Sequence, residues 1–439
     1  MGEADTPTPP GTEQSQPGPL ADAAPDQARR VLGGVRAFHT FDAFRYRNFR
    51  FLWASAFWVG GGYWLQQVVV GWLIYDITSS AFLTSVALGL EAVPLLLAGP
   101  LGGFLADVFD RRKLLLAIYL YHGSLALALG LGVALWEVGP LEIFAFTLLV
   151  GFSWVISEPT RAAIIANTVP RKGLLNAFAL ITLGWGGTRL AVPTIGGLLI
   201  AVYGPQAALF AEAGLLFTAA ASASMIRLDE GLRERPRLSE AIQGLLDGAR
   251  YVRDNRPVLA LLTIGLLPAL IVFPFVYGFL PVYAAEVYHV GPTGLGILTS
   301  ASGVGMVLGM IVVASLGDVR AKGKLIIGGV VMGALCAVAL SQIPWFLGGF
   351  GILVILGMFM PLVVTMVQAV TQSIIPDHLR GRISGLAMVT WGAFPVGSLV
   401  AGALAQALGV QTATLIGACL LGLALAAHML IFRFIWRME

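Results

Sequence analysis

Four ionisable residues stand inside long apolar stretches of the sequence and are its first candidates for chemistry. Glu91 and Arg189 each lie near the middle of such a stretch, and Glu158 and Arg161 share another. The last two are three positions apart, which puts them on one face of a helix. Charged groups are costly to bury in a membrane, so they mark pathways for ions, protons or substrates. These residue types therefore indicate binding and proton exchange.

Two of these positions have a structural interpretation beside the functional one. Glu91 would lie near the middle of a membrane helix, where it could couple transport to protons or bind substrate. It could instead be hydrogen-bonded within the bundle beside Pro94. Glu158 and Arg161 could face substrate, but an ion pair, or a latch between Glu158 and Arg111, is the preferred interpretation.

Arg189 has no acidic residue adjacent to it in the sequence. A buried guanidinium needs compensation for its charge. We therefore expect Glu91 or Glu158 close to Arg189, or an anionic substrate, and Arg189 is the strongest single candidate for a site residue.

Polar and aromatic side chains accompany these charges. Those at mid-depth in apolar runs are Trp64, Gln66, Gln67, Trp154, Trp185 and Trp391. Interfacial tryptophans belong at the ends of membrane helices, so these have another role. They could line a cavity for an amphipathic substrate or pack between helices, and packing is preferred for each tryptophan taken singly.

The elements that must position these residues are membrane-spanning helices. Of 439 residues, 57% are hydrophobic and 12% are charged, whereas soluble domains carry about 25% charged residues. Twelve apolar runs approach the roughly 20 residues that a bilayer requires. They lie at about 50–75, 81–106, 114–136, 141–168, 175–202, 207–226, 258–286, 294–316, 325–342, 347–374, 383–408 and 412–434. The sequence predicts an all-α membrane protein with twelve transmembrane helices.

The runs form two blocks of equal length, and short motifs recur between them in the same order. Ala106-Asp107-Val108 reappears as Gly317-Asp318-Val319, each followed by bases. Such repeats predict two six-helix bundles with a site between them. The predicted parts are a disordered, basic segment 1–48, a bundle 49–227, a linker with a short amphipathic helix 228–257, a bundle 258–434 and a tail 435–439.

Lysine and arginine are distributed unevenly among the predicted loops. Of the 27 Lys and Arg residues, all but Arg161 and Arg189 fall in the termini and in every second loop. Positive residues in short loops mark the cytoplasmic side. We therefore expect both termini in the cytoplasm.

The loop within 99–116 carries a glycine, an acid and a cluster of bases in a recognisable order. They are Gly103, Asp107, Arg111, Arg112 and Lys113. This pattern resembles the loop between helices 2 and 3 of the major facilitator superfamily. Val108 and Asp110 depart from the usual Arg and Gly, and the departures are similar to those in the branch that includes enterobactin-type siderophore and drug exporters. The resemblance implies that Asp107 and the bases, with Asp318 in the repeat, gate the cytoplasmic side.

A second resemblance lies after Arg189. Pro193, Gly196 and Gly197 resemble the Gly-Pro-x-x-Gly-Gly element of helix 5 in proton antiporters, with Val192 in place of the first glycine. The superfamily resemblance implies a transporter of the bacterial inner membrane that works by alternating access around a midplane site lined by helices 1, 4, 7 and 10.

Other classes of function find little support in the sequence. It has no Gly-x4-Gly-Lys-Ser/Thr motif for a nucleotide, no metal-ligand spacing among its histidines, and no nucleophile constellation of an enzyme. We expect no cofactor, no metal and no nucleic-acid partner. The partners expected are a small-molecule substrate, protons and the lipid bilayer, and the chain is expected to be a monomer.

Proton-coupled efflux of a small amphipathic molecule, such as a drug or siderophore, is the preferred function. Two alternatives stay open. One is an uptake permease for an anionic nutrient, which Arg189 would bind. The other is a non-transporting membrane sensor or lipid-handling protein.

Overall fold

Helices make up nearly all of the chain that the computed structural model describes, which comprises Gly2 and residues 39–170, 173–227, 238–316, 321–376 and 379–437. No strand occurs within these ranges. Asp318, nearly all of the predicted N-terminal segment and the first part of the linker lie outside them. The chain divides into two units, Met1–Asp42 and Ala43–Glu439. In the first unit, residues 39–42 belong to the 3-10 helix η1 (His39–Arg45), and the remaining description concerns the second unit.

The first helix set, as we call it, comprises the helices of residues 47–224. They are α2 (Arg47–Thr78), α3 (Ala81–Leu90), α4 (Val93–Val108), α5 (Arg111–Leu135), α6 (Pro140–Thr168), α7 (Leu174–Tyr203) and α8 (Pro205–Ser224). An amphipathic helix, α9 (Leu238–Asp254), follows.

The second helix set comprises the helices of residues 256–431. They are α10 (Arg256–Leu267), η3 (Pro268–Val272), α11 (Phe273–Phe275), η4 (Tyr277–Phe279), α12 (Leu280–Val282), η5 (Tyr283–Val287), α13 (Gly291–Leu316), α14 (Lys322–Gln342), α15 (Phe346–Ile374), α16 (Arg380–Trp391), α17 (Phe394–Leu408) and α18 (Val410–Ile431). The short helix η7 (Arg433–Arg437) follows.

Ten helices within the described ranges are long and apolar enough to cross a membrane. The predicted runs 50–75 and 383–408 are not among them. The first is the continuous helix α2, whose apolar character is diluted by three consecutive glycines, Gly60–Gly62, and by Gln66 and Gln67. The second is divided between α16 and α17. Both were expected as single apolar spans.

Proline explains where the helices are interrupted. The predicted helix 81–106 breaks at Glu91 and Ala92, just before Pro94, and the predicted helix 383–408 breaks before Pro395. A proline ring lacks the N–H of a helical bond and clashes with the preceding turn. The first break leaves Glu91 at a helix end, where its side chain and backbone can point away from a regular helical surface.

The segment 256–287 changes helical type several times. Pro268 begins a π-helical turn, Pro274 lies in the short helix α11, and Pro281 lies in α12 before a second π-helical turn. Single π-turns are frequent at functional sites. This segment contributes Phe273 and Tyr277 to the cavity described below.

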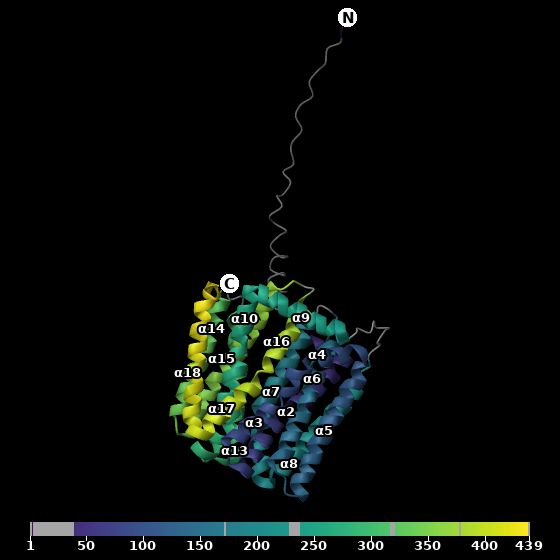
Figure 1. The fold of residues 1–439 in the computed structure, drawn as a ribbon. Coiled ribbons are helices and arrows are strands. Elements are labelled where there is room, and N and C mark those ends of the chain that lie inside the picture. Colours follow the sequence, from purple (N-terminus) through teal and green to yellow (C-terminus); the bar gives the residue numbers. More distant parts are fainter. Residues whose placement is uncertain are drawn as a thin grey trace. The chain divides into compact units, whose positions relative to one another are not determined.

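The two helix sets meet mainly along two helix pairs, α7 with α13 and α3 with α17, with smaller contacts such as that of α4 with α16. Figure 1 shows α3 beside α17, between the blue helices of the first set and the yellow-green helices of the second. Glycine makes the first contact possible: a Cβ on Gly197 would collide with the carbonyl of Pro292, and one on Gly296 with that of Pro193. Small residues allow this close approach in membrane helices.

Hydrogen bonds also join the two helix sets at these contacts. Thr194 donates to Ser300 at 2.8 Å between α7 and α13, and Ser85 donates to the carbonyl of Ser398 at 2.9 Å between α3 and α17. Ser80 adds a bond to Gln406 at 2.9 Å. The contact between the sets is therefore specific as well as apolar.

Candidate functional site

A cavity of about 590 Å³ lies between the two helix sets and takes residues from both. Eight aromatic rings line it: Tyr63, Trp64, Trp154, Trp185, Phe273, Tyr277, Trp391 and Phe394. Three charged side chains, Glu91, Glu158 and Arg189, also line it. Sites for drug-sized molecules typically have about 300–1,000 Å³, mostly apolar walls and a few polar groups. The cavity has this character.

The predicted residues divide between the cavity and its surroundings. Trp64 and Gln67 line it with the three charged groups, whereas Gln66 and Arg161 are buried outside its lining. Trp154, Trp185 and Trp391 also line it, and their rings contact other rings, such as Trp154 against Trp185 with centroids 5.6 Å apart. For these tryptophans, lining and packing are therefore combined.

Glu91 lies at the break between α3 and α4 and reaches toward α2. Gln67 Nε2 donates a hydrogen bond to its carboxylate at 2.7 Å, and Trp154 and Gln66 face the same carboxyl. The carboxyl thus lines the cavity and is also hydrogen-bonded inside the bundle, and its coupling role stays a prediction.

Aromatic rings stabilise the positive charge of Arg189. Its guanidinium carbon lies 4.5 Å from the ring centroid of Trp64 and 5.2 Å from that of Tyr277. Its Nε donates to Ser302 Oγ at 3.0 Å. Glu91 and Glu158 line the same cavity as Arg189, but among the described residues no carboxylate lies within ion-pair distance of it, and the expectation of an anionic substrate stays a prediction. The negative faces of aromatic rings attract a desolvated cation, which explains how the charge is accommodated.

Glu158 and Arg161 form an ion pair on one face of α6. The Arg161 guanidinium also lies 5.5 Å from the ring centroid of Trp185. Arg111 takes no part in this pair: it contacts Asp107 at 3.2 Å and the carbonyl of Ala106 at 3.1 Å. Of the arrangements that the sequence left open, the structure shows the ion pair.

The loop between α4 and α5 is held by its own acids and bases. Besides the Asp107–Arg111 contact, Asp110 accepts from the backbone N–H of Lys113 and caps α5, and Arg112 donates to the carbonyl of Ser224 on α8. A Cβ on Gly103 would meet nothing within 4 Å.

The helix-5 motif lies on α7. A Cβ on Gly196 would collide with Leu65, and Gly197 and Pro193 contact α13 as described above. Pro193 and Gly197 therefore form part of the contact between the helix sets, whereas Gly196 packs against α2 within the first set.

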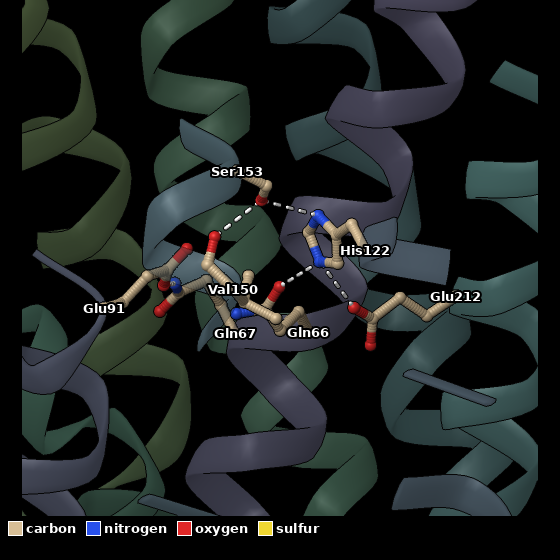
Figure 2. A network of polar contacts seen from close by, with 7 residues as sticks. All are labelled: Gln66, Gln67, Glu91, His122, Val150, Ser153 and Glu212. Carbon is tan, nitrogen blue, oxygen red and sulfur yellow. Dashed lines mark hydrogen bonds and ion pairs between the residues drawn. The ribbon is translucent and has the colours of Figure 1, made fainter. Parts of the chain in front are cut away.

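A buried polar cluster that the sequence did not predict lies beside α2, outside the lining of the cavity. It consists of Gln66, His122, Ser153 and Glu212, which come from α2, α5, α6 and α8 (Figure 2). In the sequence, His122 is one of five histidines without metal-ligand spacing, which gives no sign of this cluster. The rule that selected Glu91, an acid inside an apolar run, applies equally to Glu212.

The chain resembles solved transporter structures along nearly its whole length. A bacterial homolog of the human lysosomal transporter Spinster, in an inward-facing and unoccupied conformation, aligns with a TM-score of 0.70 at 13% identity and covers 89% of this chain and 98% of its own. A mutant of the peptide transporter POT aligns with a TM-score of 0.72 at 12% identity, with 90% and 96% covered.

This fold defines a multi-pass membrane transporter of the major facilitator superfamily. Within it, the chain belongs to the transmembrane secretion effector family, whose model matches residues 38–437. It is a transporter and not an enzyme.

Its relatives include several exporters. The multidrug efflux pump Tap of Mycolicibacterium fortuitum is 24% identical over 366 residues, covering 81% of this chain and 89% of its own length. The macrolide efflux protein A of Streptococcus pyogenes is 21% identical, with 79% and 86% covered. The enterobactin exporter EntS of Shigella flexneri is 25% identical, with 79% and 81% covered.

Proposed function

We propose that this protein is a proton-coupled exporter of a small amphipathic molecule and works by alternating access. In this proposal twelve segments span a bacterial inner membrane, both termini are cytoplasmic, and the chain works as a monomer. The observation that carries it is the cavity between the helix sets, which combines aromatic walls with one arginine and two carboxylates. Relatives that export drugs, macrolides and enterobactin support the direction of transport.

The walls of the cavity favour a molecule with both apolar and charged parts. The broad ring faces of four tryptophans can pack against flat or apolar groups of a substrate; they are Trp64, Trp154, Trp185 and Trp391. Such rings also attract cations, and the Glu91 carboxylate adds a negative group. A cationic amphipathic molecule therefore has partners for both of its parts.

Glu91 is the residue that we propose to couple transport to protons. It lines the cavity and holds a hydrogen bond from α2, so a cationic substrate and a proton compete for the same carboxyl. Its place at a helix break lets a change in its protonation alter the contact between α2 and the interrupted helix α3–α4.

An uptake permease for an anionic nutrient is the second candidate. It rests on Arg189, which faces the cavity with two rings and a hydroxyl as partners. An anionic group entering the cavity would meet a guanidinium that no carboxylate already neutralises, among the residues described.

The test uses everted membrane vesicles with an imposed inside-acid gradient and a panel of fluorescent amphipathic cations and siderophores. We expect uptake that disappears with a protonophore and in Glu91→Gln. The matched control is Glu137→Gln, which removes an exposed carboxyl from the loop before α6 and should leave uptake unchanged. Folded protein without gradient-driven flux, but with counterflow of organic acids that Arg189→Gln abolishes, would favour the uptake permease.

A further inference from the structure

The buried cluster around His122 is separate from the substrate cavity. Side-chain burial is nearly complete: the exposed fractions are 1% for Gln66, 3% for His122, 3% for Ser153 and 0% for Glu212. None of the four lines the cavity. Buried polar groups are expensive unless they are paired, and packing requires neither an imidazole nor a second carboxyl here.

The hydrogen bonds of Ser153 and His122 indicate where the protons of the cluster lie. Ser153 donates its one hydroxyl proton to the carbonyl of Val150, so toward His122 Nδ1, at 3.2 Å, it can only accept. Nδ1 must therefore carry a proton. The other ring nitrogen, Nε2, faces two oxygens: Gln66 Oε1 at 3.0 Å and Glu212 Oε1 at 3.3 Å (Figure 2).

An unprotonated Nε2 between two acceptor oxygens would be repelled by both. The contacts become favourable when one further proton lies there, either on Nε2 as an imidazolium or on the Glu212 carboxyl pointing at Nε2. In both placements the pair has zero net charge, because imidazolium neutralises carboxylate in the first and both groups are neutral in the second. Removing this proton leaves one negative charge on the pair.

Glu212 depends on His122 for this compensation. Among the described residues, its carboxyl oxygens have no polar partner other than His122. A carboxylate buried without a partner is strongly disfavoured. The pair therefore binds the extra proton at a position that water does not reach.

The cluster is connected to the cavity through neighbouring residues of α2. Gln67 donates to Glu91 at 2.7 Å, and Gln66 contacts His122 while also facing the Glu91 carboxyl. Glu91 and Glu212 lie on either side of Gln66 and Gln67 (Figure 2), and two negative carboxylates near one another are mutually disfavoured. The other ionisable groups on the inner parts of the helices packed around the pair are Tyr63 on α2, Tyr119 and Tyr121 on α5, Glu158 and Arg161 on α6, and Arg189 on α7.

We propose that His122 and Glu212 form a buried proton-binding site, distinct from the substrate cavity and linked to Glu91 through Gln66. One proton binds by forming an N–H bond at His122 Nε2 or an O–H bond at Glu212, and the net charge of the pair rises from minus one to zero. A proton on the pair removes the repulsion that opposes an ionised Glu91, which can then hold a cationic substrate. This role rests on the proposed function, whereas the proton-binding site itself does not.

The site is tested directly on purified, substrate-free protein. Nitrogen NMR of histidine-labelled protein, with His122→Gln to assign the signal, reports which ring nitrogens carry protons. Infrared difference spectra between wild type and Glu212→Gln report whether Glu212 carries the proton. We expect either a doubly protonated His122 or a protonated Glu212. An ordinary neutral His122 together with an ionised Glu212 would overturn the proposal.

The linkage to transport is tested in everted vesicles by comparing accumulation driven by a pH gradient with downhill efflux. In Glu212→Gln and His122→Gln we expect gradient-driven accumulation to fall about tenfold, within the range typical of coupling between two sites, while downhill efflux continues. The control is His428→Gln, a buried histidine of the second set that bonds to Thr263 and the carbonyl of Ala260. Equal loss of both fluxes, or no loss of coupling, would overturn the linkage.

The two proposals fail in different ways. If wild type shows no gradient-driven flux, the proposed exporter fails, but the proton at His122 and Glu212 is still measurable by spectroscopy. If wild type shows coupled flux and both variants keep it unchanged, the exporter stands and the linkage fails.

Discussion

Replacing Arg189 by glutamine should weaken the contact between the two helix sets. Arg189 lies on α7 and contacts Tyr277 and Ser302, both of which belong to the second set. A cation–π contact at a desolvated site contributes about 2 kcal/mol, and a hydrogen bond from a charged donor contributes about 1.5–3 kcal/mol. We discount this sum to about 3 kcal/mol, because glutamine can keep a weaker bond to Ser302. The third contact, between Arg189 and Trp64, lies within the first set, so it adds nothing to the free energy that holds the two sets together.

A loss of about 3 kcal/mol changes an equilibrium constant by about a hundredfold. We therefore expect Arg189→Gln to populate a conformation in which α7 and α13 have separated. The assay is a distance measurement between spin labels at Tyr203→Cys on α7 and Leu408→Cys on α17, in protein whose Cys336 and Cys419 are replaced by serine. Both label sites are exposed.

The labelled wild type should show one main distance, and Arg189→Gln should add a population at longer distance. Arg250→Gln removes an exposed arginine of α9 and serves as the control. Identical distance distributions in wild type and Arg189→Gln would refute the view that Arg189 holds the helix sets together.

Two further predictions concern the loop after α4 and the contact between α7 and α13. Asp107→Asn and Arg111→Ala should each abolish transport in vesicles while the protein still inserts. The free energy of unfolding should change by no more than about 1 kcal/mol, because the pair is partly exposed. Normal transport rates in both variants would remove the gating role. Gly296→Val should lower the melting temperature, because the new side chain would collide with the Pro193 carbonyl and overpacking costs about 1–3 kcal/mol. The control is Gly328→Val, whose Cβ would meet nothing within 4 Å and which should melt like wild type.

The positions of most helices could be predicted because their causes are local. Length and hydrophobicity decide whether a segment can cross a bilayer, and Pro94 and Pro395 decide where two of the helices break. The pairing of α3 with α17 could not be predicted in this way. It depends on Gly402 fitting closely against Phe82 and Ser85, more than 300 positions away, and a single apolar sequence does not show which small residues meet.

The candidate site shows the same division between local and distant causes. Glu91 could be selected because the cost of a carboxyl in an apolar segment follows from its position alone. The partners of Arg189 could not be predicted, because the sequence offers acids and aromatic rings alike and only the fold brings Trp64 and Tyr277 to it. The His122 cluster draws on four helices, so no spacing within one segment reveals it.

Helix α2 is the element through which these charged groups can influence one another. Three of its residues within four positions face different partners: Trp64 stacks on Arg189, Gln66 contacts His122, and Gln67 donates to Glu91. The carboxyls and the histidine belong to the first helix set, whereas Arg189 also contacts the second. A change of protonation at Glu91 or His122 can reach the contact between the sets through a small shift of α2, because the same helical turn carries all three side chains. Substituting Gln66, which lies outside the cavity lining, should therefore alter coupling more than substrate binding, whereas substituting Gln67 or Trp64, which line the cavity, should alter both.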